Sequence, residues 1–531
     1  IGEGNETQMF EDGSKYVKPQ SDVQYLGVVT TAFADRAPGT SKVIPTSCHA
    51  EIFPVYCDIP VLKEDDIRIA KNPFSPLQEG INKHGILTEN FPQELINLAA
   101  DDLRRKILAY VKPVRGCVGK LSKEVCIIGD PNVKGFEKLD FNTSEGFPYS
   151  ALRPKNAKSK IWMLDLEQQE DGQYVYNGCD DILTSVMKIK KQQRLRRELP
   201  FTVFVDCLKD RKLPLEKIKK PGSVRIFSIS PLDYTIQSRQ MFMDFSVSYQ
   251  NTRLDVEHAV GIDVNSYEWT DLAQRLMAKG NKIVALDYSN FGPSLNAACA
   301  YKAIEIIRDW YKFNGDNNPE YDTIREIMGF ELIHSVHLSQ SVCYRTLGGL
   351  PSGGPLTVIQ NSLVNCLYLR VSWLLIFSNN LNFKQIEHNQ LNDIKSDVEL
   401  YSKLNATLES FHKNVTKFVY GDDVIIAVSD IACEIYNADT IAESLHGYGI
   451  IIKNATKKNE IVKYQSLLDT ETTFLKNQFI RHPSRSRLFL AGLDKASIED
   501  TLNWTYKEWQ HKLVEISKEA SDACIRNAFG R

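Results

Sequence analysis

Apolar and polar positions along the chain follow two alternating patterns, one typical of strands and one typical of helices. Residues 282–296 predict an apolar strand that ends in a polar turn, and residues 294–315 predict an amphipathic helix stopped by Asn314-Gly315. Helices interleaved with mostly antiparallel strands predict an α+β fold. Further elements are expected as helices at 93–111, from Pro355 to about 377 and at 438–447, and as strands at 460–469 and 472–480.

The segment KFVYGDDVIIAVSD, residues 417–430, predicts a tight hairpin with two carboxylates at its tip. Its flanks are rich in β-branched and aromatic residues, which favour strands, and Gly421-Asp422-Asp423 has the composition of a turn. Adjacent carboxylates repel each other unless a cation lies against them. Gly and Asp are also common in exposed turns for local reasons, so the hairpin alone leaves a plain turn and a metal site open.

Asp287 stands at the end of the strand that precedes SNFGPS. A single Asp in this position is usually a turn or helix-capping residue. Carboxylates at two strand ends, Asp287 and the pair Asp422 and Asp423, could nevertheless converge on divalent cations, because hard cations such as Mg²⁺ take oxygen ligands and keep substrate phosphates. Two such ions roughly 3.5–4 Å apart support an in-line phosphoryl displacement. The pattern therefore indicates a candidate two-metal site.

A glycine-rich loop, GGLPSGGP at 348–355, precedes an apolar helix. Glycines let the backbone approach a ligand closely, and a helix N-terminus offers N–H donors. On that helix Thr357, Asn361 and Asn365 recur every fourth residue and form one polar stripe. Their neighbours are too apolar for a surface helix, so we expect the stripe to line a polar cleft rather than to face solvent.

The net charge of −3 over 531 residues indicates no particular partner, but the charge is unevenly distributed. Residues 188–225 hold thirteen Lys or Arg and four acids, a surplus that suggests a basic channel facing a polyanion. Part of 188–197 has an alternative interpretation as the outer face of a helix.

Composition disfavours several other classes of protein. Eleven scattered cysteines without a CxxC fit a reducing compartment and disfavour a zinc site. The opening residues lack the apolar core of a secretory signal. The most apolar run, 366–377, is interrupted by Arg370 and is too short for a bilayer, so we expect no transmembrane segment.

Eight segments of the chain resemble, in order, those of the RNA-dependent RNA polymerases of picorna-like viruses, of picornavirus, dicistrovirus or iflavirus type. Four carry the candidate chemistry: the strand ending at Asp287, PSGG…T…N at 351–361, YGDD at 420–423 and FLKN at 474–477. Four more resemble the loop where the template enters, the nucleotide channel, the segment before the first catalytic strand and a segment with a functional lysine: TSEGFPY at 143–149, SVRIFSISPLDY at 223–234, AVGIDV at 259–264 and GYGIIIKNATKK at 447–458.

The resemblance implies a right-handed polymerase of fingers, palm and thumb with an antiparallel palm sheet. The expected boundaries are fingers at 1–241, palm at 242–332, a fingers insertion at 333–349, palm again at 350–484 and a thumb at 485–531. Only 54 residues follow FLKN, so either the thumb is small or the sequence given ends within it.

Site residues follow from the resemblance, position by position. Asp287, Asp422 and Asp423 are the expected ligands of two Mg²⁺ ions, with Mn²⁺ as a substitute, and Lys457 is the expected general acid for the leaving pyrophosphate, although a lysine in KK is often only a solvated charge. The expected nucleotide-binding residues are Arg225, Lys209, Arg211, Ser352, Thr357 and Asn361. The expected RNA-binding residues are Ser144, Gly146, Pro148, Lys190, Lys191, Arg194, Arg196, Arg197 and Lys476.

The implied activity is replication of a positive-strand viral RNA genome from nucleoside triphosphates. The implied partners are template and product RNA, a small viral protein primer and other replication proteins. The implied location is the host-cell cytoplasm, at membrane-associated replication complexes.

One position departs from the picornavirus pattern. Picornavirus enzymes carry a second Asp five residues after the first, where it helps to sense the ribose 2′-hydroxyl, whereas this chain has Gly292. With no carboxylate there, Asn361 and Ser352 are the expected partners of that hydroxyl.

Two alternatives compete with this interpretation. Reverse transcriptases share the paired-Asp hairpin, but they exclude ribonucleotides with a bulky side chain near the position of Gly292, and glycine cannot do so. A catalytically inactive RNA-binding protein on the same fold is the other alternative, and it is disfavoured because every carboxylate that the chemistry needs is present.

Overall fold

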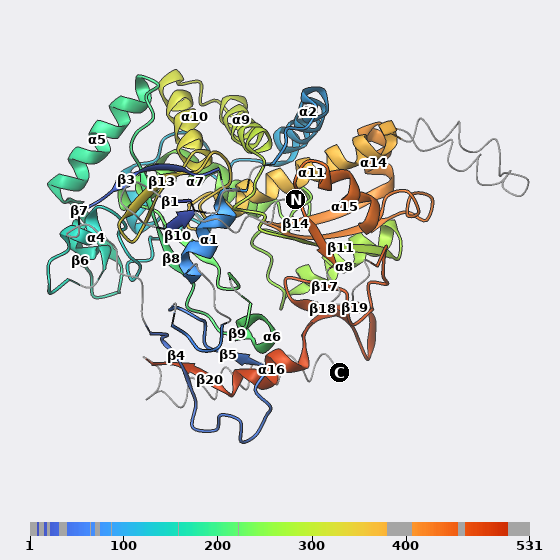
Figure 1. Cartoon of the computed structure of the whole chain (residues 1–531). Coiled ribbons are helices and arrows are strands. Elements are labelled where there is room, and N and C mark those ends of the chain that lie inside the picture. Colours follow the sequence, from blue (N-terminus) through green and yellow to red (C-terminus); the bar gives the residue numbers. More distant parts are fainter. Residues whose placement is uncertain are drawn as a thin grey trace, which may run out of the picture.

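The computed structural model describes residues 8–9, 15–17, 22–30, 40–63, 65–69, 75–86, 88–157, 159–220, 222–379, 406–454 and 462–507. Helices and mostly antiparallel strands alternate along the chain, as the pattern predicted, and they form several sheets (Figure 1). Two of these sheets position the candidate site.

The first sheet has four antiparallel strands in the order β14 (Val415–Tyr420), β15 (Asp423–Val428), β11 (Lys282–Tyr288) and β16 (Ile452–Asn454). Helices α11 (Thr357–Asn379) and α15 (Ala438–His446) contact one face of it, and α8 (Tyr267–Lys279) contacts the other. We call it the palm sheet.

Side chains of β15 alternate between two separate clusters of buried apolar residues. Val424, Ile426 and Val428 pack into the largest cluster, which includes α11, whereas Ile425 and Ala427 pack against α8. A strand covered on both faces has no solvent side, which explains why the flanks of Gly421-Asp422 are continuously apolar.

The second sheet has five strands in the order β10 (Ile226–Ile229), β8 (Val203–Leu208), β12 (Val336–Ser339), β13 (Val342–Arg345) and β3 (Gln24–Val28). Helix α1 (Pro76–His84) packs on it, and α7 (Leu232–Asn251) follows β10 directly. Buried Asp206 joins three strands of this sheet, because it accepts hydrogen bonds from Ser228 Oγ at 2.8 Å, His337 Nδ1 at 2.9 Å and the Tyr344 hydroxyl.

The last described segment returns from the palm to the N-terminal part of the chain. Strands β17 (Thr473–Phe474), β18 (Asn477–His482) and β19 (Arg485–Leu493) form a small sheet that packs on α8. Beyond it, α16 (Lys495–Thr501) leads to β20 (Trp504–Tyr506), which pairs with β4 (Val43–Pro45). Figure 1 shows this pairing at the foot of the molecule. The predicted boundaries of fingers, palm and thumb stay predictions.

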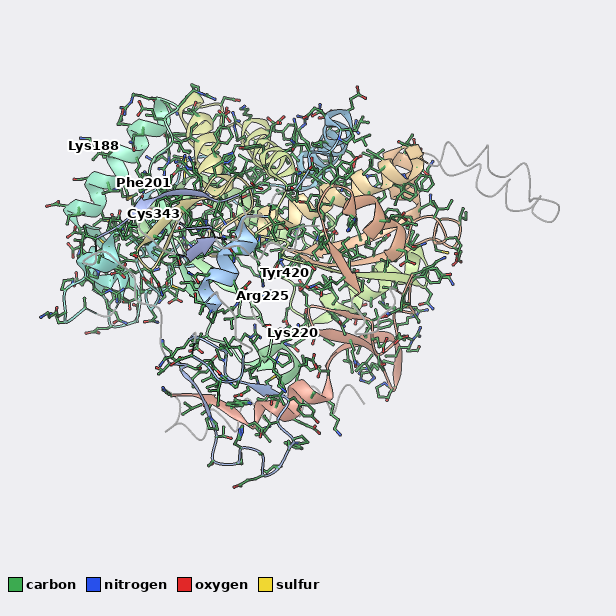
Figure 2. All side chains as sticks on the ribbon, in the orientation of Figure 1. Lys188, Phe201, Lys220, Arg225, Cys343 and Tyr420 are labelled. Carbon is green, nitrogen blue, oxygen red and sulfur yellow. The ribbon has the colours of Figure 1, made fainter. Side chains whose placement is uncertain are left out.

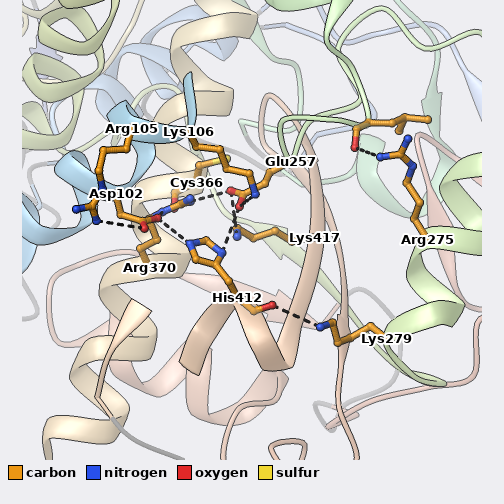
Figure 3. A network of polar contacts seen from close by, with 11 residues as sticks. Asp102, Arg105, Lys106, Glu257, Arg275, Lys279, Cys366, Arg370, His412 and Lys417 are labelled. Carbon is orange, nitrogen blue, oxygen red and sulfur yellow. Dashed lines mark hydrogen bonds and ion pairs between the residues drawn. The ribbon is translucent and has the colours of Figure 1, made fainter. Parts of the chain in front are cut away.

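A network of charged residues around buried Glu257 lies beside β14, at the edge of the palm sheet (Figure 3). Glu257 accepts from Lys106 Nζ at 2.7 Å, Arg370 at 2.8 Å and Lys417 Nζ at 3.0 Å, and Arg370 also pairs with Asp102 at 2.8 Å. These residues come from α2 (Gln93–Tyr110), α11, β14 and the segment before α8, so the network ties four parts of the chain together.

Most of the predicted elements are confirmed. The helices expected at 93–111, 294–315, 355–377 and 438–447 are α2, α9 (Ala297–Phe313), α11 and α15. The strand expected at 460–469 is wrong for its described part, 462–469, which makes only an isolated bridge between Gln465 and Ile283. That segment pairs with β11 at this one position, near the start of the strand, and the pairing does not continue. Across the described ranges, the helices lack the combination of length and apolar sequence that a membrane span requires.

Candidate active site

The two carboxylate segments meet at one end of the palm sheet. In the hairpin, Tyr420 pairs with Asp423, and Gly421 takes a φ of +65° in the two-residue turn, a conformation that glycine adopts readily. Leu286 of β11 pairs with Val424 of β15, so the next residue, Asp287, lies beside the tip of the hairpin. The sequence-based expectation that the acids converge agrees with this register.

Helix α11 holds the hairpin tip through its polar stripe. Asn365 Nδ2 donates to the carbonyl oxygens of Gly421 at 3.1 Å and Asp422 at 3.4 Å, and Asn365 Oδ1 accepts from the Tyr288 hydroxyl at 3.2 Å. Ser362 Oγ accepts from the Gly421 N–H at 2.8 Å. The hairpin and the end of β11 are therefore fixed to the same helix.

Electrostatics at the tip favour binding of a cation. Removal from bulk water, followed by the neighbouring carboxylates of Asp422 and Asp287, raises the pKa of Asp423 to about 6. The pKa of Asp287 is also raised, chiefly by desolvation and further by Asp422, while Lys217 and Arg225 oppose that shift. Like charges held together in this way are relieved by a bound cation.

A cleft of about 510 Å³ opens beside these acids. Asp287, Asp422, Ser352, Asn361 and Gly292 all line it. Its lining also contains five basic side chains, which are Lys83, Lys217, Lys220, Arg225 and Lys453. Carboxylates for a metal and cations for a polyphosphate thus share one cleft.

The glycine-rich loop lies between the two sheets. Gly353 forms a bridge with Ile229, and a Cβ at Gly353 would lie 2.1 Å from the Ser228 carbonyl oxygen, so the close approach is to β10 rather than to a ligand. Ser352 is exposed to the cleft and donates to the Ile226 carbonyl at 3.3 Å. Thr357 is turned to the loop, because its Oγ1 donates to the carbonyls of residues 351 and 354 at 2.9 and 2.8 Å.

Asn361 is a buried polar residue that lines the cleft. Its side chain is 9% exposed, and no described residue donates a hydrogen bond to its Oδ1. A buried acceptor without a donor costs free energy unless a ligand or water satisfies it. Gly292 lines the same cleft, and a Cβ there would meet only the Leu350 carbonyl oxygen, at 3.8 Å, so the position has room for a side chain.

Other predicted cations gather near the hairpin. The charges of Arg211, Arg225 and Lys217 add to desolvation in lowering the pKa of Lys476, which Asp423 opposes, so these side chains lie within electrostatic reach of one another. Lys209 is exposed at the end of β8, where its N–H donates to the Arg225 carbonyl at 2.9 Å. Lys476 occupies the turn between β17 and β18.

Two residues predicted to bind RNA belong to the protein interior. Arg194 of α5 (Asp181–Leu195) is fully buried and makes a bidentate ion pair with Glu331, at 2.5 and 2.9 Å. Lys190 is 9% exposed and pairs with Asp233 at 2.8 Å. This burial contradicts direct RNA contact in the structure described, so we remove both from the candidate RNA-binding residues.

The remaining cations of that cluster stay on the surface. Arg196 pairs with Glu198 and Arg197 pairs with Glu326, each at 2.8 Å, and Lys191 is half-buried. Figure 2 shows Lys188 of the same helix at the edge of the molecule, far from Arg225 and Tyr420 at its centre. The interpretation of 188–197 as the face of a helix accounts for this cluster better than a nucleotide channel does.

The segment predicted to admit the template borders a second cavity. Ser144 lines this cavity, which has a volume of about 690 Å³ and reaches Gly353 and Leu356 of the glycine loop. Gly146 has a φ of +71°, and a Cβ there would lie 2.8 Å from the Ser230 carbonyl oxygen. Pro148 caps the short helix α4 (Tyr149–Leu152). Asp287 and Asp422 line the cleft but not this cavity, so the two spaces are distinct.

Sequence reasoning missed two lysines of the cleft. Lys453 of β16 pairs in register with Asp287, and Lys83 of α1 donates to the Gly222 carbonyl. Nothing local distinguishes either lysine from a solvated charge, because both reach the site through strand pairing or packing. Lys457, the expected general acid, lies outside the described residues.

Comparisons with known proteins agree with the geometry. The family "Viral RNA-dependent RNA polymerase" matches residues 60–524. A genome polyprotein of Deformed wing virus is 36% identical over 513 residues, which are 96% of this chain and 16% of the polyprotein. A replicase polyprotein of Cricket paralysis virus is 30% identical over 445 residues, 81% of this chain and 23% of that polyprotein. The chain thus spans less than a quarter of either relative.

A solved structure matches almost the whole chain. The Sicinivirus 3Dpol RNA dependent RNA polymerase superposes with a TM-score of 0.71 at 18% identity and covers 95% of this chain and 94% of that one. The two chains therefore share an α+β fold.

Proposed function

Because the chain belongs to the viral RNA-dependent RNA polymerase family, as its ordered motifs predicted, we propose that it copies RNA from nucleoside triphosphates by two-metal nucleotidyl transfer. One observation carries the proposal: Asp287 and the Asp422-Asp423 tip meet beside a cleft with five basic side chains. The role would be replication of a positive-strand viral RNA genome.

Asp287, Asp422 and Asp423 would hold two Mg²⁺ ions, or Mn²⁺ in their place. Within the described ranges, no three His, Cys, Asp or Glu side chains are grouped closely enough to enclose a metal by themselves. That suits Mg²⁺, which is commonly held by one or two carboxylates together with waters and substrate phosphates. The raised pKa of Asp423, caused first by desolvation and then by the charges of Asp422 and Asp287, supports the same donors. When bound, the ions would activate the attacking hydroxyl and stabilise the leaving oxygen.

Basic residues of the cleft would bind the triphosphate. Arg225 lines the cleft, and its guanidinium suits bidentate contact with phosphate oxygens. Lys209 and Arg211 follow at the end of the neighbouring strand. The expected general acid, Lys457, remains a proposal from the resemblance alone.

Ribose recognition would depend on Asn361 and Ser352. An amide can both donate and accept hydrogen bonds, and the unsatisfied Oδ1 of Asn361 can accept a hydrogen bond from a hydroxyl. Thr357 would act indirectly, because its hydroxyl fixes the loop that carries Ser352. With Gly292 in place of a carboxylate, these groups would recognise the 2′-hydroxyl.

RNA would pass on both sides of the glycine loop. Ser144, Gly146 and Pro148 would shape the path of the template, and Lys476 would support the primer strand beside Asp423. Lys191 of α5, together with Arg196 and Arg197 just after its end, could attract RNA only diffusely, because α5 lies at the edge of the molecule (Figure 1).

The resemblance also supports three proposals about context. They are priming by a small viral protein, cooperation with other replication proteins, and activity in the host-cell cytoplasm at membrane-associated complexes.

A primer-extension assay tests the proposed function. RNA and DNA templates are each offered with ribonucleotides and with deoxyribonucleotides, in the presence of Mg²⁺. We expect extension with RNA template and ribonucleotides above all. Preference for deoxyribonucleotides would favour a reverse transcriptase, and RNA binding without extension would favour an inactive RNA-binding protein.

A further inference from the structure

The edge strand of the palm sheet brings a lysine to the carboxylates. Strand β16 pairs antiparallel with β11, and Asp287 is directly opposite Lys453. Residues directly opposite in such a pair project from the same face, with Cβ atoms roughly 4.5–5.5 Å apart. Lys453 therefore rises from the sheet on the face that carries Asp287.

Lys453 is an exposed residue on the wall of the cleft. Lys453 lines it together with Asp287, Asp422 and Arg225. Its charge opposes the rise in the pKa of Asp287 and contributes to the lowered pKa of Lys83, which desolvation mainly causes. The ammonium group is thus within electrostatic reach of a metal-binding carboxylate on one side and of α1 on the other.

Structural roles do not account for this lysine. No ion pair joins Lys453 to a carboxylate in the part of the chain that the structure describes, although Asp287 lies opposite it in the strand pairing and within Coulombic reach. Lys83, by contrast, already donates to the Gly222 carbonyl. A lysine can protect an edge strand from pairing with other chains, but that role does not require the lysine to line a cleft.

The charged side chains around Lys453 indicate which kind of ligand the cleft would bind. Five basic side chains and two carboxylates line the cleft, so its walls attract an anion with several charges. Arg225 directly precedes β10 and Lys453 lies on β16 of the palm sheet, so a polyphosphate lying across the cleft would meet cations at both sheets. An ammonium binds phosphate oxygens as a compact point charge.

We propose that Lys453 is a substrate-contacting residue that binds phosphate oxygens of the incoming nucleoside triphosphate from the palm sheet, next to Asp287. This proposal rests on the proposed polymerase function and adds a palm-side ligand to Arg225. In this role Lys453 supplies a positive charge to the phosphate oxygens and transfers no proton.

Lys453→Gln removes the charge, Lys453→Arg keeps it, and Lys463→Gln is the matched control. Lys463 lies ten residues along the chain, is exposed, and pairs with Glu434 at 3.5 Å. The direct measurement is equilibrium binding of ATP with Mg²⁺, and the kinetic one is KM and kcat for ATP on a primed RNA template. Tm and affinity for RNA report whether the variants remain folded.

Lys453→Gln should weaken ATP binding and raise KM by roughly ten- to hundredfold, the usual effect of losing a hydrogen bond to a charged group, with Tm and RNA affinity unchanged. Lys453→Arg should recover most of the loss, and Lys463→Gln should match the wild type. Equal ATP affinity in Lys453→Gln and Lys463→Gln would overturn the proposal. If the wild type still incorporates ribonucleotides in that case, the polymerase assignment stands and only the role of Lys453 falls.

Discussion

Two groups of charged residues lie at opposite ends of the same strand, β14, and they are built in opposite ways. Near its start, Lys417 enters the buried network around Glu257, where every acid is met by a cation (Figure 3). At its end, the hairpin tip holds Asp422 and Asp423 beside Asp287, and like charges face one another.

This difference indicates that the network around Glu257 stabilises the fold, whereas the hairpin tip is suited to bind a cation. In the network, opposite charges keep the pKa of Glu257 well below its usual range despite desolvation, which means that the folded protein stabilises the charged form. At the tip, desolvation and then the neighbouring carboxylates raise the pKa values of Asp423 and Asp287, so the folded protein alone does not compensate these charges. Perturbed carboxylates that lack a protein partner and line a cleft are typical of functional sites.

The largest expected effect comes from removing a carboxylate at the tip. Asp422→Asn should lower nucleotide incorporation by several orders of magnitude, because metal–phosphate interactions contribute several kcal/mol to the transition state and each ~1.36 kcal/mol is about tenfold in rate. RNA affinity and Tm should stay near those of the wild type. Single-nucleotide incorporation and filter binding measure both. A rate within tenfold of the wild type would show that Asp422 does not serve the chemistry.

The buried network should respond in the opposite way. Glu257→Gln leaves Arg370, Lys417 and Lys106 without their shared partner, which should cost about 3–5 kcal/mol of unfolding free energy. The control Glu409→Gln breaks an exposed pair with Lys413 and should leave the free energy of unfolding close to that of the wild type, because exposed ion pairs contribute little. Denaturant unfolding gives both values, and similar costs would mean that the network does not stabilise the fold.

A smaller effect is expected at Asn361. Asn361→Ala should lower the preference for ATP over dATP by about 1–3 kcal/mol, because a buried polar group discriminates against a substrate that lacks its partner hydroxyl. Gly292→Asp, at the neighbouring cleft position, should not improve the preference. The ratio of kcat/KM for ATP and dATP decides: an unchanged ratio in Asn361→Ala places ribose sensing elsewhere.

The smallest expected effect concerns pH. With a pKa of about 6 in the folded state, against an ordinary value near ~3.9, Asp423 keeps its proton longer in the folded protein than in the unfolded one. Its contribution to stability is therefore present below the unfolded pKa and is lost as pH rises through about 6. Asp423→Asn should flatten this part of the pH dependence, measured by denaturant unfolding without divalent cations. The same slope in both proteins would contradict the assigned cause.

The local pattern of apolar and polar residues was enough to predict the hairpin and the main helices. The apolar flanks of Gly421-Asp422 form the expected hairpin. Of the polar stripe on α11, Asn361 lines the cleft as expected, whereas Asn365 holds the hairpin tip and Thr357 holds the glycine-rich loop. The order of the motifs along the chain also predicted the family. Each of these signals lies within a single element, so tertiary structure had little to override.

Errors arose where distant residues decide the outcome. Arg194 looks like an RNA-binding cation until Glu331, 137 residues away, neutralises it in the interior. Lys453 looks like an ordinary lysine until the pairing of β16 with β11 sets it opposite Asp287. Burial, ion pairing and register between distant strands are absent from local composition, so neither residue could be assigned from its own segment.

Thermal unfolding with and without Mg²⁺, in the absence of RNA and nucleotides, tests the contrast between the two charge clusters most directly. A cation that binds only the folded state stabilises it by mass action. We predict that Mg²⁺ raises the Tm of the wild type and of Glu409→Gln, and that the double variant Asp287→Asn, Asp422→Asn loses this rise. An equal Mg²⁺-dependent rise in the double variant would contradict the account.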